Sequence, residues 1–243
     1  MIQVIRNSQR YHAENEWLSS YWHFSFDNYY DPANMSFGPL RVFNEDVVAP
    51  ANGFPLHPHR EMEIVTYLID GQLEHRDTAG NRGVISAGEV QRMSAGTGIR
   101  HSEFNPSDKT PAHLVQLWIE PAVAHLPPSW EQKRYPLAER TGKLLPVAVP
   151  AGGNGTRPAH AVEIHQNATI YTSLLAPGQS VAHTLGPNRR GYVFVIAGQL
   201  TVNGQQLQAG DQARVSAEKA LQFAGPASGS KSPAADFLFL DLP

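Results

Sequence analysis

The sequence has no cysteine, no long apolar run and no excess of basic charge. The absence of cysteine excludes a disulfide framework, a thiolate nucleophile and any cysteine-ligated zinc or iron–sulfur centre, so a metal would have to be held by His, Asp or Glu. No apolar stretch approaches the roughly 18 residues of a membrane span, and the N-terminus lacks the pattern of a secretory signal. A net charge of −3 and a pI near 6.4 give no basic surface for nucleic acid. We therefore expect a cytoplasmic protein with no membrane partner and no direct nucleic-acid contact.

The residues that are present are typical of a globular β-protein. Of the 243 residues, 41% are hydrophobic and 17% are charged, which is too apolar for a disordered chain. Glycine (20) and proline (19) divide the chain into short pieces. Short β-branched or aromatic runs, bounded by turn residues, predict strands within 61–70, 113–121, 191–200 and 236–242. Many short strands with glycine-rich turns favour an all-β sandwich or barrel.

The two halves of the chain resemble each other. "YLIDGQLEH" (67–75) and "FVIAGQLTV" (194–202) share Gly-Gln-Leu, and each is followed by Ala-Gly and an acidic residue, Glu89 or Asp211. Self-similarity of this kind indicates two copies of one β-unit.

The echo suggests a division of the chain. We expect an N-terminal metal-binding barrel over 1–125, a Pro/Gly-rich connector over 126–160, and a C-terminal barrel without a metal site over 161–243. Within the connector, we expect one short helical turn around 128–133.

Two short motifs contain residues suited to metal binding, His57-Pro58-His59 and His101-Ser102-Glu103. With 11 histidines in 243 residues, chance alone gives about 0.5 His-x-His pairs, so the spacing by itself decides little. The context of each pair is more specific. His57-x-His59 leads to Gly71, and Gly88 and Gly96 precede His101, with Asn105 after it.

This arrangement resembles the cupin superfamily and implies a bicupin fold, two tandem jelly-roll-like β-barrels packed together. One position departs from the cupin pattern, because the usual glutamate ligand falls on Ile64. Glu63 is one residue off, and alternation along a strand would aim it to the other face. Glu103 is the natural replacement, since it shares a face with His101 on an extended segment.

Three longer segments resemble the pirin family, specifically its bacterial members with quercetin dioxygenase activity. They are "WHFSFDNYYDP", "HPHREMEIVTYLIDG" and "SAGTGIRHSEFNPS", and the resemblance is dense over about 17–120 and weaker towards the C-terminus. It implies a metal site formed by His57, His59, His101 and Glu103.

The resemblance also implies an activity, in which a flavonol and O₂ react at one metal per chain, the central ring opens and carbon monoxide is released. Iron(II) is the metal that the family implies, and three imidazoles with one carboxylate leave two octahedral positions open, as a non-haem iron oxygenase requires. Cu, Ni, Mn, Co and Zn stay open, because such ligands bind several of these metals as tightly. Glu103 has a possible second, catalytic role as the base that accepts the flavonol proton.

A second hypothesis stays open beside the enzyme. Other pirins are metal-bound regulators that act through protein partners, so the same site could serve as a sensor without turnover. A third, an isomerase-like or storage cupin, is disfavoured because it would keep the glutamate that Ile64 has displaced.

The remaining candidates have weaker signals. Gly96 and Gly98 would allow a tight turn behind His101, and Glu61 and Glu63 would anchor Arg or Lys or lie behind the metal ligands. Six aromatic residues line a planar-substrate pocket or form barrel core: Trp22, Phe24, Phe26, Phe37, Phe43 and Phe54. Six histidines lack a constellation and are expected at the surface or in the core: His12, His75, His113, His125, His160 and His165.

The second half has lost the ligand pattern. His183 stands alone, with Leu185 at the second ligand position and Gly191 where the motif glutamate would be. We expect this half to be a structural lobe.

Overall fold

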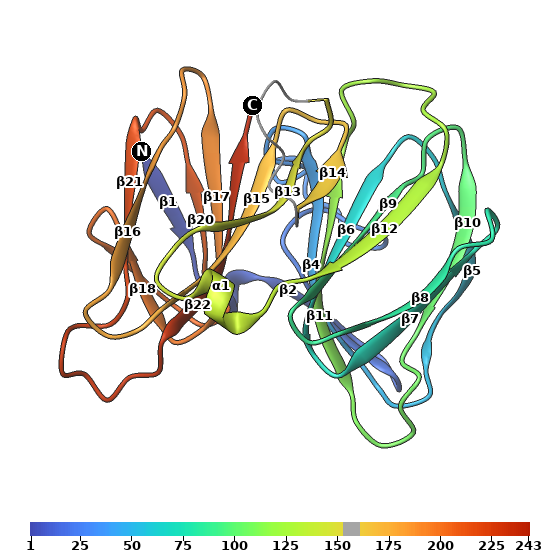
Figure 1. The fold of residues 1–243 in the computed structure, drawn as a ribbon, viewed down its shortest axis with the longest axis horizontal. Helices are drawn as coiled ribbons and strands as arrows, with labels where there is room; N and C mark the ends of the chain where they lie inside the picture. The colour runs from blue at the N-terminus through green and yellow to red at the C-terminus, as the bar shows by residue number, and fades with distance from the viewer. Residues whose placement is uncertain (153–160) are drawn as a thin grey trace.

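The computed structural model of the protein describes residues 1–152 and 161–243, and almost every regular element in them is a strand (Figure 1). The first barrel consists of a seven-stranded and a four-stranded sheet. In sheet order, the seven strands are β12 (Ser129–Arg134), β9 (Glu89–Ser94), β6 (Glu63–Asp70), β11 (Ala112–Ile119), β4 (Leu40–Val48), β3 (Leu18–Trp22) and β2 (Tyr11–Glu14). The four are β5 (Gly53–His59), β10 (Ile99–Phe104), β7 (Gln72–Asp77) and β8 (Arg82–Ser86).

The second barrel has the same construction. Its seven-stranded sheet runs β1 (Ile2–Ile5), β20 (Gln212–Val215), β17 (Arg190–Ala197), β22 (Ala235–Leu242), β15 (Thr169–Leu175), β13 (Leu145–Pro150) and β14 (Val162–Ile164). Its four-stranded sheet runs β16 (Ser180–Thr184), β21 (Ala220–Ala224), β18 (Gln199–Val202) and β19 (Gln205–Gln208). The first strand of the chain, β1, therefore lies in the sheet of the second barrel, antiparallel to β20.

The predicted all-β class with two cupin-type barrels is confirmed, as are the four predicted strands.

The prediction of a helical turn around 128–133 is wrong. This stretch forms β12, which pairs with the edge strand β9, and a single helical turn, α1 (Leu137–Arg140), follows it; a 3₁₀ turn, η1 (Asn7–Gln9), lies near the N-terminus. The boundaries 1–125, 126–160 and 161–243 stay predictions, while β12 and β13 show that strands of both barrels arise between 126 and 152. Within the described residues, no helix has the length and apolar character that a membrane crossing needs.

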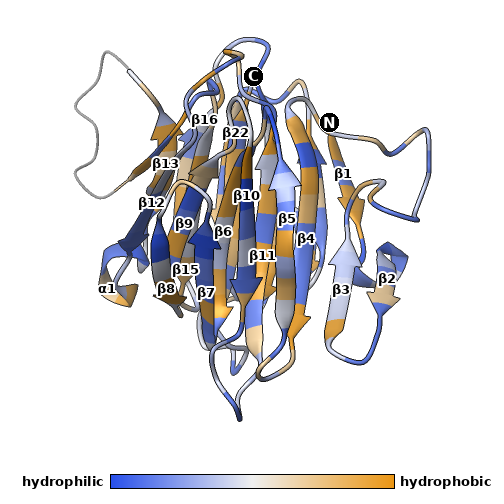
Figure 2. Ribbon diagram, turned by 90° about the vertical axis from the view of Figure 1, so that its right-hand side faces the viewer, coloured by the Kyte–Doolittle hydropathy of each residue, from blue (hydrophilic) through white to orange (hydrophobic). Residues whose placement is uncertain are grey.

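The two seven-stranded sheets face each other and share a hydrophobic core (Figure 1). Side chains alternate between the faces of a strand, so β4 contributes to two environments. Phe43 packs against Phe194 of the second barrel with ring centroids 5.1 Å apart, whereas Asn44 and Asp46 line a cavity inside the first barrel. Figure 2 shows the outer strands β7 and β10 of that barrel as mostly hydrophilic. The first barrel thus has a polar interior beside an apolar interface.

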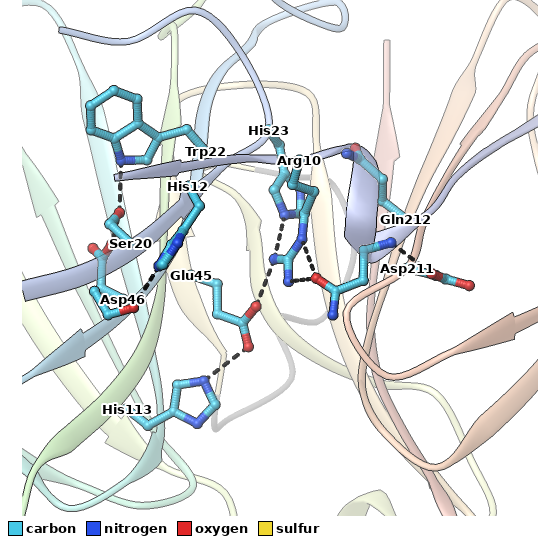
Figure 3. Close-up of polar contacts among 12 residues, drawn as sticks. Arg10, His12, Ser20, Trp22, His23, Glu45, Asp46, His113, Asp211 and Gln212 are labelled. Carbon is cyan, nitrogen blue, oxygen red and sulfur yellow. Dashed lines mark hydrogen bonds and ion pairs between the residues drawn. The ribbon is translucent and has the colours of Figure 1, made fainter. Parts of the chain in front are cut away.

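Polar contacts also cross the interface (Figure 3). On the side of the first barrel, Arg10 donates to Glu45 Oε2 over 2.6 Å, and the Arg10 side chain is only 2% exposed. His23 Nδ1 lies 2.5 Å from the hydroxyl of Tyr192 on the second barrel. Burial lowers the pKa of His23 well below its ordinary value, and Arg10 and Arg214 lower it further, so this imidazole is neutral. The two barrels are therefore fixed to each other by packing and by directional bonds.

Candidate metal centre

Two antiparallel strands, β5 and β10, position the predicted ligands. Their register places His101 opposite His57 and Ile99 opposite His59, so the three histidines lie on the inward face. Gly96, at φ 48°, turns the chain into β10, and a Cβ there would come within 1.9 Å of the Leu126 carbonyl oxygen. The expected tight turn before His101 is therefore present.

The structure brings His57, His59 and His101 into one cluster. Their ring centroids are 4.7 Å (His57–His59), 4.5 Å (His57–His101) and 4.8 Å (His59–His101) apart. One ring nitrogen from each lies within 4.8 Å of the other two. A second set with the same spacing consists of His75, His101 and Glu103. His101 is common to both sets, so Glu103 lies close to one of the three clustered histidines.

Two of the three imidazoles, those of His59 and His101, are held in the neutral form that binds metals. Burial lowers the pKa of His59 to about 3, helped by His101 and His57. Burial also lowers the pKa of His101 to about 3, helped by His57 and His75. Both rings therefore carry a free lone pair at neutral pH.

The hydrogen-bond pattern leaves one ring nitrogen of each histidine without a partner among the residues that the structure describes. His57 Nδ1 lies 2.7 Å from the carbonyl oxygen of Pro55, so it carries the proton and leaves Nε2 free. His59 Nε2 and His101 Nε2 are buried, and no residue in the described part of the chain forms a hydrogen bond with either. Buried polar atoms without partners are rare in proteins, and a first-row divalent metal would satisfy both nitrogens. The donor set therefore fits such a metal.

Glu103 is held from the opposite sheet by two glutamine side chains. Gln91 Nε2 donates to Glu103 Oε1 over 3.2 Å, and Gln116 Nε2 donates to Glu103 Oε2 over 2.7 Å. Glu103 as a whole is only 2% exposed. Each carboxylate oxygen keeps a second lone pair, so Glu103 can still accept a proton or bind a metal.

His75 belongs to the site, although it was expected only at the surface or in the core. It is fully buried and lies opposite Glu103 in the pairing of β7 with β10. Its Nε2 is 3.0 Å from Asp77 Oδ2, and its Nδ1 is 3.3 Å from His101 Nδ1. A carboxylate only accepts, so His75 Nε2 carries the proton, His75 Nδ1 accepts from His101 Nδ1, and His101 Nε2 is left as the free ligand atom.

The sequence could have indicated His75 only through the alternation of β7, in which Leu73, His75 and Asp77 share one face. Burial opposes ionisation of Asp77, but hydrogen bonds from His75 and Asn81 hold its pKa below the ordinary value. Asp77 therefore stays a carboxylate and keeps its role as acceptor.

A cavity of about 470 Å³ adjoins the cluster, and both His57 and Glu103 line it. Of the six aromatic residues proposed for a pocket, Trp22, Phe26 and Phe54 line it, together with Trp118, which the sequence did not single out. The others, Phe24, Phe37 and Phe43, pack in or against the core between the barrels. A cavity walled by aromatic rings suits a planar ligand.

Several other predictions can be compared with the structure. Ile64 is buried in a small apolar cluster with Met93, Ala95 and Ile99, and Glu63 faces away, accepting from His165 Nδ1 over 3.1 Å. Glu61 and Glu63 were expected to anchor Arg or Lys or to lie behind the metal ligands. The first alternative is wrong, because Glu61 accepts from the backbone N–H of His125 and Glu63 is paired with His165. His160 lies outside the described residues.

The second barrel shows no matching cluster of His, Asp or Glu in the residues that are described. His183 Nε2 lies 2.7 Å from Asp241 Oδ2, and Leu185 is buried in the core. That this half is a structural lobe without a metal site stays a prediction.

The fold and the site together define a class, a double-barrel cupin with a cluster of histidines suited to a metal in its first barrel. Family models agree, with "Pirin" matching residues 4–119 and "Quercetinase C-terminal cupin domain" matching 154–242. The chain belongs to the pirin family, as the sequence predicted, and is a quercetin 2,3-dioxygenase-like member of it.

Individual relatives support this assignment. A protein of Escherichia coli (strain K12) named quercetin 2,3-dioxygenase is 38% identical over 243 residues, which cover 100% of this chain and 99% of the relative. A pirin-like protein of Caulobacter vibrioides is 43% identical over 209 residues, covering 86% of this chain and 88% of the relative. Among solved structures, the bacterial pirin YhhW of Escherichia coli in complex with nickel(II) superposes with a TM-score of 0.89 at 37% identity, covering 100% of this chain and 99% of that one. The likeness to a nickel complex and the histidine cluster point to one divalent metal.

Proposed function

We propose that the protein is a metal-dependent dioxygenase that opens the central ring of flavonols such as quercetin with O₂ and releases carbon monoxide. The observation that carries this proposal is a cluster of three imidazoles beside a cavity lined by aromatic rings, in which His59 and His101 are neutral and have buried nitrogens without partners in the described part of the chain. Relatives that match the whole chain and are named quercetin 2,3-dioxygenase support the same substrate class.

We assign the metal ligands as His57, His59, His101 and Glu103. Iron(II) is the proposed metal, and when bound it would supply coordination of the flavonol oxygens and activation of O₂. Three neutral histidines and one carboxylate give a site of net charge −1, which a divalent cation changes to +1. Such a site attracts a monoanionic chelator, and a flavonol that has lost its 3-hydroxyl proton is one.

The side chains around the cluster bind the substrate and manage its proton. Glu103 is the proposed base for the 3-hydroxyl, and Gln91 and Gln116 fix the orientation of its carboxylate from the opposite sheet. Trp22, Phe26 and Trp118 present apolar ring surface to a planar substrate and exclude water from it.

The test is the detection of carbon monoxide. Protein reconstituted anaerobically with iron(II) and then exposed to O₂ and quercetin should release carbon monoxide, and the His59→Ala variant should not. Parallel samples loaded with nickel(II) would identify the metal that supports turnover. A protein shown to hold its metal but releasing no carbon monoxide with any metal would overturn the proposal and favour a regulatory role through protein partners.

The variant Glu103→Gln tests the proposed base separately. It keeps a polar group of the same size but removes the charge and the proton acceptor, so kcat should fall by about 100-fold or more while part of the metal affinity remains. Unchanged turnover and unchanged metal binding would show that another residue takes the proton.

A further inference from the structure

A second polar element lies in the same cavity, on strands β3 and β4 rather than on the strands that carry the histidines. Ser20, Asn44 and Asp46 line the cavity among residues that are otherwise mostly apolar. Strand pairing sets Asp46 opposite Ser20, and Asn44 opposite both Trp22 and Gln116. None of these groups is used by the histidine cluster or by the proposed base.

The hydrogen bonds of this element have a fixed direction (Figure 3). Trp22 Nε1 can only donate, and it does so to Ser20 Oγ over 2.7 Å. The single hydroxyl proton of Ser20 is then donated to Asp46 Oδ1. No other hydrogen bond from the described residues reaches the Asp46 carboxylate, so Asp46 Oδ2 has no donor in that part of the chain.

Asn44 provides an independent second observation. The side chain is 7% exposed, and its Oδ1 is buried without a hydrogen-bond partner among the residues described. It lies two residues before Asp46 on β4, so both side chains point to the same face of the sheet. Asn44 Oδ1 and Asp46 Oδ2 are therefore two acceptors on one wall of the cavity that have no donor among the described residues. A ligand with hydroxyl groups would satisfy both of them.

Aromatic rings connect this element to the histidine cluster. Trp118 meets His59 edge-on at 4.8 Å, Phe26 meets Trp118 at 5.4 Å, and Trp22 meets Phe26 at 5.2 Å. Across the sheet, Asn44 lies opposite Gln116, and Gln116 donates to Glu103. The strand that carries Asn44 and Asp46 is therefore the neighbour of the strand that carries Gln116, about 4.8 Å away. A planar ligand with one end at the histidines and Glu103 would place its remaining rings along this wall.

We propose that Asp46, with Asn44 beside it, forms a subsite that accepts hydrogen bonds from hydroxyl groups on the part of the substrate that does not bind at the histidine cluster. The subsite makes the pocket selective for polyhydroxylated aromatic chelators over chelators that lack those hydroxyls. It deepens the proposed function, on which it rests for the identity of the pocket. A buried acceptor left unpaired by the wrong ligand costs binding energy, which is why sites built to bind a hydroxyl reject analogues without it.

The ionisation of Asp46 is compatible with this role. Burial raises the pKa of Asp46 to about 7; the Ser20 hydroxyl opposes this rise, and Glu103 adds to it. Glu45 adds to it as well, and His113 opposes it. Above pH 7 the group is a carboxylate with no cation bonded to it in the described residues, so hydroxyl donors from a ligand would add to the stabilisation that the Ser20 hydroxyl provides.

The experiment measures binding without turnover. Nickel(II)-loaded protein is titrated anaerobically at pH 8 with quercetin and with 3-hydroxyflavone, a flavonol that lacks the other hydroxyls, and quenching of tryptophan fluorescence reports Kd. Wild type should bind quercetin at least about 10-fold more tightly than 3-hydroxyflavone. Asp46→Asn, which keeps an oxygen for Ser20, should weaken quercetin binding at least about 5-fold and leave 3-hydroxyflavone unchanged. Asp70→Asn, an exposed carboxylate on β6, is the matched control and should keep the wild-type ratio.

An unchanged ratio in Asp46→Asn, or an equal loss for both ligands, would overturn the subsite. Asn44→Ala is the second variant; it should lower the ratio about 3-fold, and an unchanged ratio there would also count against the subsite if Asp46→Asn does not fold. The outcome is separate from that of the proposed function. A protein that releases no carbon monoxide can still show the selectivity, and an active enzyme with an unchanged ratio would lack the subsite.

Discussion

The sheet β5–β10–β7–β8 of the first barrel and the sheet β16–β21–β18–β19 of the second have the same strand order, so their positions can be compared one by one. We take His57 and His183 as equivalent positions. His57 on β5 pairs with His101 on β10, and His183 on β16 pairs with Leu221 on β21, so His101 corresponds to Leu221. On this basis, four polar residues of the first barrel have apolar counterparts: His59 and Leu185, His101 and Leu221, Glu103 and Phe223, His75 and Val202.

These differences between equivalent residues give the two barrels different interiors. In the second barrel, Leu221, Phe223 and Val202 belong to a continuous hydrophobic core, and His183 is paired with Asp241. In the first, the equivalent space holds buried polar atoms and an open cavity. A filled apolar core stabilises a fold, whereas unsatisfied polar groups and cavities cost stability. The comparison indicates that one barrel contributes stability while the other keeps a polar interior with a cavity and with groups that lack partners among the described residues.

The largest expected effect comes from giving the first barrel a residue of the second. His101→Leu places the counterpart Leu221 at the centre of the cluster, and affinity for nickel(II) should fall by more than about 1,000-fold, because a ligand is lost and not merely a supporting partner. The affinity is measured by competition with a chromophoric chelator. His125→Leu, at an exposed histidine, is the control and should bind as wild type does; loss of affinity in the control alone would contradict the assignment of the site.

The reverse comparison concerns stability. Phe223→Ala removes a fully buried ring from the core of the second barrel and should lower the free energy of unfolding by about 3–5 kcal/mol. Glu103→Gln at the equivalent position of the first barrel should change it by less than about 1 kcal/mol in metal-free protein. Urea unfolding followed by circular dichroism measures both. Equal losses in the two variants would mean that the first barrel depends on its interior as much as the second does.

The features of the two barrels that depend only on short sequence patterns could be predicted from the sequence. The shared Gly-Gln-Leu at 71–73 and 198–200 indicated the repeated strand plan, and the His-x-His and His-x-Glu spacings placed each pair on one face of a strand. These features need only alternation along a strand. The loss of ligands in the second half could be predicted in the same way, from Leu185.

Features that depend on strand register could not be predicted. His75 reaches His101 because β7 pairs with β10, and nothing within "QLEHRD" specifies that pairing. The stretch at 128–133 has no clear alternation, and it forms a strand because the edge of β9 supplies backbone partners, which overrides local preference. The subsite at Asn44 and Asp46 was missed for the same reason, since it requires β3 and β4 to be folded against the cavity.

A smaller effect concerns the cost of the polar interior. The pKa of Asp46 is about 7 in the folded protein against 3.8 ordinarily, so between these values the native state holds a proton that the unfolded chain has lost. The free energy of unfolding therefore falls as pH rises through this window. Asp46→Asn removes the penalty and should stabilise the protein at pH 8 by an amount on the order of 2–4 kcal/mol, with little effect near pH 4.

Thermal unfolding of metal-free protein at pH 4.5 and pH 8 measures this difference. Asp70→Asn, at an exposed carboxylate, should show no pH-dependent gain. A gain for Asp46→Asn that is equal at both pH values would show that the carboxylate is not the source of the penalty.

The smallest expected effect tests the chain of bonds behind His101. Asp77 Oδ1 accepts from the backbone N–H groups of Ala79 and Asn81, so an asparagine would keep its oxygen there and turn its amide N–H₂ towards His75. His75 Nε2 would then have to accept, and its Nδ1–H would donate to His101 Nδ1. That reversal moves the remaining proton of His101 to Nε2, where the free lone pair is needed.

We expect Asp77→Asn to weaken nickel(II) binding by about 10- to 100-fold while leaving the fold intact. Chelator competition measures the affinity and ¹⁵N chemical shifts of the imidazoles report the tautomer. Unchanged affinity with a changed tautomer would show that His101 binds the metal without help from Asp77, and the polar residues of β7 would then differ from Val202 of the second barrel for another reason.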